Sequence, residues 1–167
     1  VRLANHLLAQ DIQSVVFART RRSVEIILTY LQGTSEQGSG TGNPKTKPLV
    51  PGSSSLIRGY RSGYLPHQRR EIEQGLRDGS VKTVVATNAL ELGIDIGGLG
   101  AAILVGYPGT IASARQQSGR AGRGDDPAVS VLVASPNPLD QFLAHHPEYF
   151  FGSSPEQALV NPNHLLI

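Results

Sequence analysis

The chain contains five short runs of apolar residues, separated by longer stretches of mixed character. Four of these runs are nearly continuous rather than alternating, and the fifth, over residues 55–60, is weaker. A continuous apolar run of this length is typical of a strand that is buried on both faces, as in a parallel sheet covered by helices. The strong runs, which we predict to be strands, are Val15–Ala18, Thr83–Thr87, Ala101–Tyr107 and Val129–Ala134.

Helical patterns lie between these runs. Thr110 is suited to the N-cap of one helix and Pro66 to the first turn of another, while Gly79 and Pro147 are suited to positions just beyond helix ends. The predicted helices are residues 22–31, 66–78, 111–118 and 139–146. Strands that alternate with helices indicate an open, doubly wound α/β domain with a mainly parallel sheet and helices on both faces. Functional sites are then expected at the carboxyl ends of the strands.

Two segments depart from this pattern. Residues 33–54 are rich in Gly and Ser, which predicts a flexible surface loop, with a functional insertion as the alternative. Residues 151–167 are rich in Pro and Asn and indicate a connector toward a missing carboxy-terminal domain. We therefore predict one folded domain over residues 1–150.

The composition narrows the class of protein. The absence of cysteine excludes disulfides and thiolate metal sites and favours a cytoplasmic location. The absence of methionine predicts that the chain is a piece of a longer protein. No run of eighteen apolar residues occurs, so we expect no membrane partner. Arg supplies 12 of the 15 basic residues, which favours phosphate recognition, although GC-rich coding would give the same bias.

The octet Gln-Gln-Ser-Gly-Arg-Ala-Gly-Arg occupies residues 116–123. Arg120 and Arg123 lie three residues apart, close to one helical turn, so both guanidinium groups can project from one face. A guanidinium is planar, forked and always charged, and one placed at a γ-phosphate under cleavage can raise the rate about 10³- to 10⁵-fold. A basic helix end on a solvated surface is the alternative for the octet taken alone.

Polar residues also follow two of the predicted strands. Arg19 and Thr20 lie between the first strand and the helix after it, where backbone N–H groups, a hydroxyl and a positive charge suit a phosphodiester backbone. The alternative is that Thr20 is only an N-cap beside solvated arginines. In residues 87–95, Gly93 permits close approach of a ligand, and Asp95 can accept a hydrogen bond from a ribose hydroxyl or can instead fix its own loop.

Taken in order, residues 15–20, 87–95 and 116–123 resemble motifs IV, V and VI of superfamily 2 helicases. The resemblance extends from about residue 3 to residue 150. It implies the second RecA-like, or helicase C-terminal, domain of a DEAD/DEAH-box DNA helicase. Such a domain supplies arginines across a cleft to ATP and forms part of the nucleic-acid track.

The resemblance also distributes roles among individual residues. Arg120 and Arg123 are the catalytic pair, and Gln116 orients the loop and senses the nucleotide. The nucleotide-binding set is Gly93, Asp95, Gln116, Arg120 and Arg123. The nucleic-acid-binding set is Arg19, Thr20, Arg61, Thr87 and Asn88.

The chain lacks other parts of an ATPase. It has no Gly-x-x-x-x-Gly-Lys-Ser/Thr phosphate loop, and no Asp-Glu pair follows an apolar strand. ATP with magnesium is therefore expected to be held mainly by a missing first RecA-like domain of the same polypeptide, and the isolated chain should be inactive. His145 and His146 lie near Glu148, but no further ligands follow at suitable spacing, so no metal site is expected.

Three further segments narrow the resemblance. Tyr60–Pro66, Tyr107–Ser113 and His146–Tyr149 are similar to the mitomycin-repair-factor-A group, which includes fungal RecQ-four-like relatives. Residues 89–95 are similar both to this group and to the large helicase-related proteins. The large helicase-related proteins usually carry His where this chain has Arg123, which argues against them. The first group implies an ATP-dependent DNA helicase that moves 3′ to 5′ on single-stranded DNA in DNA repair. An RNA helicase, a double-strand translocase and a non-enzymatic nucleic-acid-binding module are the alternatives.

Overall fold

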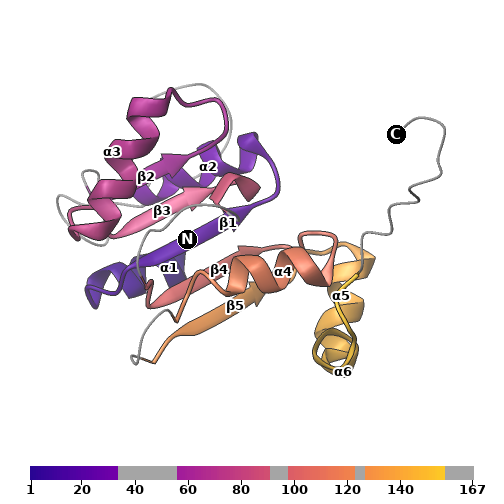
Figure 1. Ribbon diagram of the computed structural model, residues 1–167. Helices are drawn as coiled ribbons and strands as arrows, with labels where there is room; N and C mark the ends of the chain where they lie inside the picture. The colour runs from indigo at the N-terminus through magenta and orange to yellow at the C-terminus, as the bar shows by residue number, and fades with distance from the viewer. Residues whose placement is uncertain (34–55, 91–97, 123–126, 157–167) are drawn as a thin grey trace, which may run out of the picture.

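Five parallel strands form the sheet at the centre of the domain. The computed structural model describes residues 1–33, 56–90, 98–122 and 127–156. The strand order is β2-β3-β1-β4-β5, and β3, β1 and β4 start level, because Ser14 pairs with both Thr83 and Ala101 (Figure 1). The strands are β1 (Ser14–Ala18), β2 (Ile57–Tyr60), β3 (Thr83–Ala86), β4 (Ala101–Val105) and β5 (Val129–Val133).

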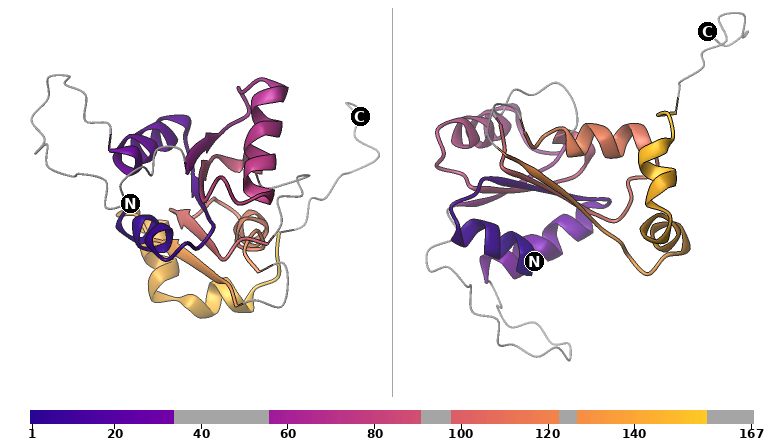
Figure 2. Two further views of the ribbon diagram at one scale, coloured as in Figure 1. Left: turned by 90° about the vertical axis from the view of Figure 1, so that its left-hand side faces the viewer. Right: turned by 90° about the horizontal axis from the view of Figure 1, so that it is seen from below.

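Helices cover both faces of this sheet. Figure 2 shows α1 and α2 on one face and α3 and α4 on the other, and Figure 1 shows α5 and α6 beside the end of β5. The helices are α1 (Arg2–Ala9), α2 (Arg21–Gln32), α3 (Pro66–Arg77), α4 (Ile111–Ser118), α5 (Pro138–His145) and α6 (Pro147–Gly152).

The order of the connections explains how the helices divide between the two faces. From β1 the chain passes β3 to reach β2 through α2, whereas the steps through α3 and α4 run in the opposite direction across the sheet. Because crossovers between parallel strands are right-handed, opposite directions place the helices on opposite faces. This arrangement confirms the predicted doubly wound α/β fold.

The strands contribute side chains to two apolar clusters, one on each face. On β1, Val15 and Phe17 belong to the cluster beneath α3 and α4, and Val16 and Ala18 belong to the cluster beneath α1 and α2. All residues of β1 are buried. Burial on both faces is the reason that this strand appears in the sequence as an unbroken apolar run.

The predicted punctuation of the helices is largely confirmed. The Oγ1 atom of Thr110 accepts a hydrogen bond from the N–H of Ser113 (3.1 Å), and α4 spans the predicted residues. Gly79 has φ +79° and directly follows the C-cap of α3. Gly33 ends α2 with φ +70°, and the rest of the predicted loop, residues 34–54, lies outside the described residues.

Two short helices, α1 and α6, go beyond the elements predicted from the sequence. Helix α1 has eight residues and no side-chain cap, so its buried Ala4, Leu7 and Leu8 give only a weak local pattern. Pro147 follows α5 as predicted, but it also occupies the first position of α6, where proline is well tolerated. Within the described residues, no helix has both the length and the apolar character needed to cross a membrane.

Candidate nucleic-acid and nucleotide site

A hollow of about 310 Å³ opens at the carboxyl ends of the central strands. Its lining comes from the end of β1, the 3-10 turn Asn88–Leu90 after β3, the end of β4 and one side of α4. We name it the edge hollow. The polar side chains that line it are those of Arg19, Asn88, Ser113 and Gln117.

The structure brings together two of the predicted nucleic-acid residues, Arg19 and Asn88, in the edge hollow. Both are exposed. Arg19 directly follows β1, and Asn88 lies two residues after the end of β3. The two strands are hydrogen-bonded neighbours, which explains why residues so far apart in the sequence meet at one edge of the sheet.

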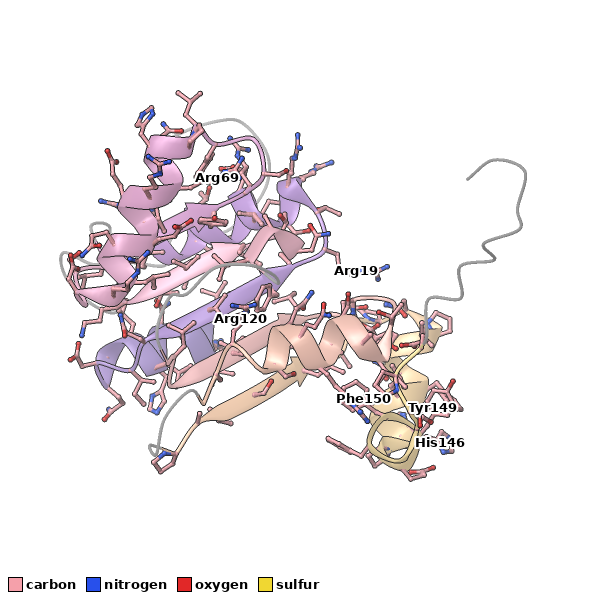
Figure 3. The ribbon with its side chains drawn as sticks, in the orientation of Figure 1. Arg19, Arg69, Arg120, His146, Tyr149 and Phe150 are labelled. Carbon is pink, nitrogen blue, oxygen red and sulfur yellow. The ribbon has the colours of Figure 1, made fainter. Side chains whose placement is uncertain are left out.

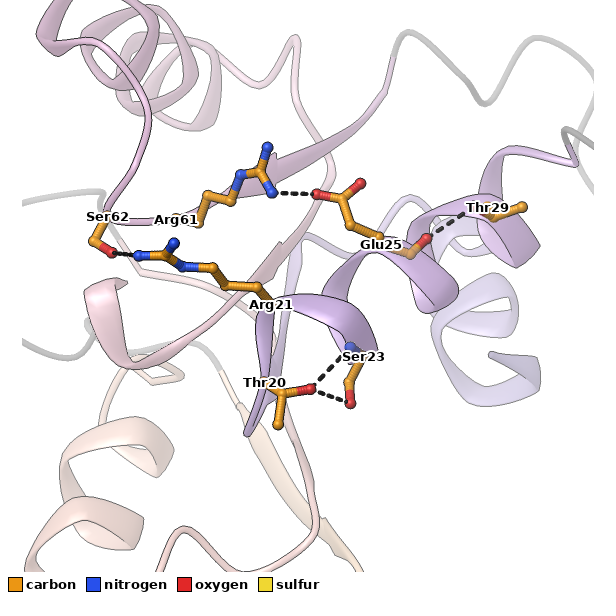
Figure 4. Close-up of polar contacts among 7 residues, drawn as sticks. All are labelled: Thr20, Arg21, Ser23, Glu25, Thr29, Arg61 and Ser62. Atoms are coloured by element: carbon orange, nitrogen blue, oxygen red, sulfur yellow. Dashed lines mark hydrogen bonds and ion pairs between the residues drawn. The ribbon is translucent and has the colours of Figure 1, made fainter.

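Thr20 and Thr87 use their hydroxyl groups for local contacts. The Oγ1 atom of Thr20 accepts a hydrogen bond from the N–H of Ser23 (3.0 Å) and shares another with the Ser23 hydroxyl (2.8 Å), so Thr20 caps α2 (Figure 4). The Oγ1 atom of Thr87 accepts a long hydrogen bond from the N–H of Ala89 (3.5 Å). The capping role considered for Thr20 is therefore present, and contact of either threonine with nucleic acid stays a prediction.

Arg61, the fifth residue predicted to bind nucleic acid, is already engaged. Its Nη1 lies 2.8 Å from the Oε1 atom of Glu25 on α2 (Figure 4). The Arg61 guanidinium also lies 5.1 Å from the centre of the Tyr64 ring. The Arg61 side chain is 35% exposed, so the ion pair remains open to solvent. A phosphate would have to compete with Glu25 for this guanidinium.

Two further arginines hold the turn that follows β2. Arg69 on α3 donates from Nη2 to the carbonyl of Ser62 (2.8 Å) and from Nε to the carbonyl of Tyr64 (3.2 Å). Arg21 at the start of α2 donates to the Ser62 hydroxyl (3.3 Å), as Figure 4 shows. These contacts give Arg69 a structural role in the turn.

Helix α4 leads the chain back to the opposite, amino edge of the sheet. After α4, the N–H of Gly122 donates to the carbonyl of Leu99 (3.0 Å), and Ala121 forms a parallel bridge with Leu99, just before β4 begins. Figure 3 shows Arg120 near the end of α4 and Arg19 beyond the end of β1. The expectation that functional sites lie at the carboxyl ends of the strands therefore does not hold for Arg120, because α4 runs antiparallel to the strands.

Arg120 is 7% exposed in this structure, so its side chain is buried within the domain. Gln116 is exposed, whereas its neighbour Gln117, which sequence reasoning missed, is 6% exposed and lines the edge hollow. The N–H of Arg120 donates to the carbonyl of Gln117 (3.2 Å). The remaining nucleotide-site residues, Gly93, Asp95 and Arg123, lie outside the described residues.

Asp140 is a second residue that sequence reasoning missed. It is 1% exposed and accepts hydrogen bonds from the N–H of Tyr107 (3.2 Å) and from the N–H and hydroxyl of Ser135 (2.8 and 2.6 Å). Burial pulls the pKa of Asp140 upward, but hydrogen bonds with Ser135, Asn137 and Tyr107 outweigh it and hold that pKa below its usual range. Its position after Asn137-Pro138 gave only the signal of a helix start.

Glu156 caps α4 from the segment that follows α6. Its two carboxylate oxygens accept hydrogen bonds from the N–H groups of Ile111 (2.9 Å) and Ala112 (3.0 Å). The pKa of Glu156 is lowered, and the hydrogen bond from the N–H of Ile111 contributes most to this shift. Arg115 donates to the carbonyl of Ser153 (2.9 Å), so residues 153–156 are attached to α4 at two points.

Similar sequences and folds occur in known helicases. The family described as helicase conserved C-terminal domain matches residues 1–125. The uncharacterized ATP-dependent helicase YprA of Bacillus subtilis is 49% identical over 165 residues, which are 99% of this chain and 20% of that protein. The ATP-dependent helicase HRQ1 of Saccharomyces cerevisiae is 38% identical over 142 residues, which are 85% of this chain and 12% of that protein.

The solved structures include a close match to the whole chain. The DUF1998 helicase MrfA bound to DNA and AMPPNP has a TM-score of 0.84 at 48% identity, covering 99% of this chain and 21% of that one. This chain therefore spans about a fifth or less of the length of these relatives. The matches confirm the predicted resemblance to the mitomycin-repair-factor-A and fungal RecQ-four-like group.

Proposed function

We propose, from the premise that this chain belongs to the helicase conserved C-terminal domain family, that it is the second motor domain of an ATP-dependent DNA helicase. The observation that carries the proposal is the edge hollow, where Arg19 and Asn88 meet at one edge of the sheet. Helix α4 lines this hollow and leads to Arg120 at the other edge. The similar MrfA structure is described as bound to DNA and AMPPNP, which supports DNA and ATP as the ligands.

In this proposal the carboxyl edge contacts the sugar-phosphate backbone of single-stranded DNA. Arg19 supplies a positive charge, Asn88 supplies an amide, and the first turn of α2 supplies backbone N–H groups. Thr20 and Thr87 contact the same backbone, next to the local hydrogen bonds that they form with Ser23 and Ala89. Arg61 joins the track when a phosphate replaces Glu25 as its partner.

We propose that the nucleotide-binding set supplies one half of the ATP site. Arg123 is the residue that we assign to the γ-phosphate, beside Arg120, while Gln116, Gly93 and Asp95 contact or sense the nucleotide. A guanidinium suits phosphate oxygens, which is the chemistry that this half provides. The described residues contain no group of three or more His, Asp or Glu side chains that could hold a metal ion. Because the sequence has no Gly-x-x-x-x-Gly-Lys-Ser/Thr phosphate loop and no Asp-Glu pair after an apolar strand, we assign magnesium and the phosphate cradle to a first RecA-like domain and expect the isolated chain to be inactive.

The proposed cycle depends on two conformations of the motor that differ in their affinity for ATP and its products. When nucleotide is shared between the two motor domains, the arginines complete the site and the carboxyl edge grips the strand; after hydrolysis this contact is lost and the grip shifts. From the resemblance to the mitomycin-repair group we further propose 3′ to 5′ movement, a role in DNA repair and a cytoplasmic location.

The experiment that tests the proposal is ATP hydrolysis by the full-length protein without nucleic acid, with single-stranded DNA and with RNA of equal length. Strong stimulation by DNA alone is the expected result. Equal stimulation by RNA would instead indicate an RNA or dual-substrate motor. No hydrolysis under any condition would overturn the proposal in favour of a non-enzymatic binding module.

A further inference from the structure

Asp140 is a buried carboxylate that the helicase motifs do not include. It lies in the first turn of α5 and is 1% exposed. One carboxylate oxygen accepts from the N–H of Tyr107 (3.2 Å), and the other accepts from the N–H (2.8 Å) and the hydroxyl (2.6 Å) of Ser135. A carboxylate this deep requires such donors, because its removal from water is otherwise very unfavourable.

The donors show which part of the fold Asp140 fixes. Tyr107 lies two residues after the end of β4, and Ser135 lies two residues after the end of β5. The N–H of Gly106 also donates to the carbonyl of Val133 (2.9 Å). Asp140 therefore clamps the chain segments that leave these two neighbouring strands, at the same edge of the sheet as the edge hollow.

Gly106 lies between Asp140 and Arg19. Its φ of +82° favours glycine, and a Cβ atom at this position would lie 3.3 Å from the Oδ2 atom of Asp140 and 3.4 Å from the Cδ atom of Arg19. The aliphatic part of Arg19 thus lies close to the backbone that Asp140 holds. The charge of Asp140 lies beside the same glycine.

The charge of Asp140 adds an electrostatic effect to this contact. Hydrogen bonds with Ser135, Asn137 and Tyr107 outweigh the effect of burial on the pKa of Asp140 and lower it, so the group is ionised at neutral pH. A negative charge near the Arg19 side chain favours orientations that keep the guanidinium at this edge, and burial of the carboxylate reduces its screening by solvent.

We propose that Asp140 is a positioning residue, which fixes the turn at Gly106 and Tyr107 and so sets the place at which the Arg19 guanidinium meets a nucleic-acid phosphate. The inference rests on the proposed function, because it takes Arg19 as a nucleic-acid contact. It predicts that Asp140 acts on nucleic-acid affinity through Arg19, and not on the chemistry of ATP.

A double-mutant cycle in the full-length protein tests this inference, with Asp140→Asn, Arg19→Ala and the combination. Asn has the same shape as Asp, but it lacks the charge and turns an amide donor toward N–H donors. The readouts are the single-stranded DNA concentration that gives half-maximal ATP hydrolysis, and the maximal rate. We expect Asp140→Asn to raise that concentration about tenfold while the maximal rate stays within about twofold.

The combination separates positioning from an independent effect. Arg19→Ala should also raise the half-saturating DNA concentration about tenfold, because a charged hydrogen bond to phosphate is lost. The double variant should be no worse than Arg19→Ala, because Asp140 then has no guanidinium to position. Independent effects would multiply to about a hundredfold.

Asn137→Ala is the matched control for a structural defect. The Oδ1 atom of Asn137 accepts from the N–H of Asp140 (2.9 Å) and caps α5, and its amide also donates to the Ser135 hydroxyl. Asn137→Ala should lower the melting temperature but leave the half-saturating DNA concentration unchanged, because the Asp140 carboxylate keeps all three hydrogen bonds from Tyr107 and Ser135. A merely structural role for Asp140 predicts that both variants shift this concentration in parallel with their melting temperatures.

The outcomes distinguish the inference from the proposed function. Unchanged DNA affinity in Asp140→Asn, or effects that multiply with those of Arg19→Ala, overturn the positioning role alone. Unchanged DNA affinity in Arg19→Ala shows that Arg19 is not a nucleic-acid contact. The proposed role of Arg19 and the positioning role of Asp140 then both fail. If Asp140→Asn does not fold, Ser135→Ala replaces it in the cycle with an expected shift of about threefold, because one of the three hydrogen bonds is lost.

Discussion

Thr20 offers a test that separates helix capping from nucleic-acid binding. Its hydroxyl accepts the N–H of Ser23 at 3.0 Å and caps α2 (Figure 4). Thr20→Ala removes this acceptor and should lower the free energy of unfolding by about 1 kcal/mol. Thr20→Asp keeps an acceptor and adds a negative charge at the positive end of the helix, which should raise the free energy of unfolding by about 0.3 to 1 kcal/mol instead.

Nucleic-acid affinity should respond in a different order. A carboxylate at residue 20 that lies about 5 Å from a phosphate raises the free energy of binding by about 1 kcal/mol in water and about 3 kcal/mol at an effective dielectric constant of 20. Thr20→Asp should therefore weaken DNA binding about 5- to 150-fold. Thr20→Ala loses at most a neutral hydrogen bond and should weaken binding about threefold.

Two measurements and one control decide the question. Urea unfolding of the 167-residue chain gives the stabilities, and fluorescence anisotropy of labelled single-stranded DNA with the full-length protein gives the affinities. Thr29→Asp is the control, because it places the same charge in the last turn of α2, where it should lower stability slightly and leave DNA binding unchanged. If Thr20→Asp binds DNA like the wild type, Thr20 is only a cap; if Thr20→Ala is fully stable, the capping argument is refuted.

Three further predictions concern Glu25, Tyr60 and Arg123. Glu25→Gln removes the half-exposed ion pair with Arg61 and should lower the free energy of unfolding by at most about 0.5 kcal/mol. The affinity for DNA should rise and depend more steeply on salt concentration, because the Arg61 guanidinium is then available to a phosphate. If anisotropy titrations show the same DNA affinity as the wild type, Arg61 is not part of the nucleic-acid track. Burial and the hydrogen bond to Glu73 raise the pKa of Tyr60 from 10.0 to about 12. Because the folded-state pKa is raised, the stabilisation is complete below pH 10 and is lost as the pH rises toward 12. Urea unfolding should therefore show that the free energy of unfolding declines more steeply over this pH range for the wild type than for Tyr60→Phe. Parallel declines would contradict this prediction. Arg123→Ala in the full-length protein should abolish ATP hydrolysis and spare most DNA binding, and normal turnover would refute its assignment to the γ-phosphate.

Strands β1, β3 and β4 could be predicted because they are buried on both faces, whereas β5, which its apolar run predicted to be buried, is mostly exposed. Val15 to Ala18 face two different layers of helices, so no polar residue interrupts the run and its length alone indicates a strand. The caps Thr20 and Thr110 were equally local signals. Helix α6 was not predictable in this way, because Pro147 is compatible with both the end of one helix and the start of the next.

The geometry of the candidate site could be predicted only for residues that directly follow a strand. Arg19 and Asn88 each follow an apolar strand, so their meeting at one edge follows from a parallel sheet. Asp140 gave no such signal, because its partners Tyr107 and Ser135 come from the ends of two other strands that only the fold brings together. The amino-edge location of Arg120 depended likewise on where α4 ends, which no motif spacing specifies.

Helix α4 is the physical link between the two edges. Ser113 and Gln117 line the edge hollow, and the carbonyl of Gln117 accepts the N–H of Arg120 (3.2 Å). A helix of eight residues is about 12 Å long, so α4 connects the two edges directly. Glu156 accepts hydrogen bonds from the N–H groups of Ile111 and Ala112, so the segment after α6 is attached to the same helix.

Under the proposed function, nucleic acid and nucleotide therefore act on a single element. Coupling through such an element is reciprocal, because the free energy by which nucleotide tightens the grip on DNA equals the free energy by which DNA tightens the grip on nucleotide. Equilibrium affinities for a non-hydrolysable nucleotide, measured with and without DNA, should thus change by the same factor as the affinities for DNA measured with and without that nucleotide. Substitutions that affect only the carboxyl edge, such as Arg19→Ala, should weaken DNA binding while leaving nucleotide affinity in the absence of DNA unchanged.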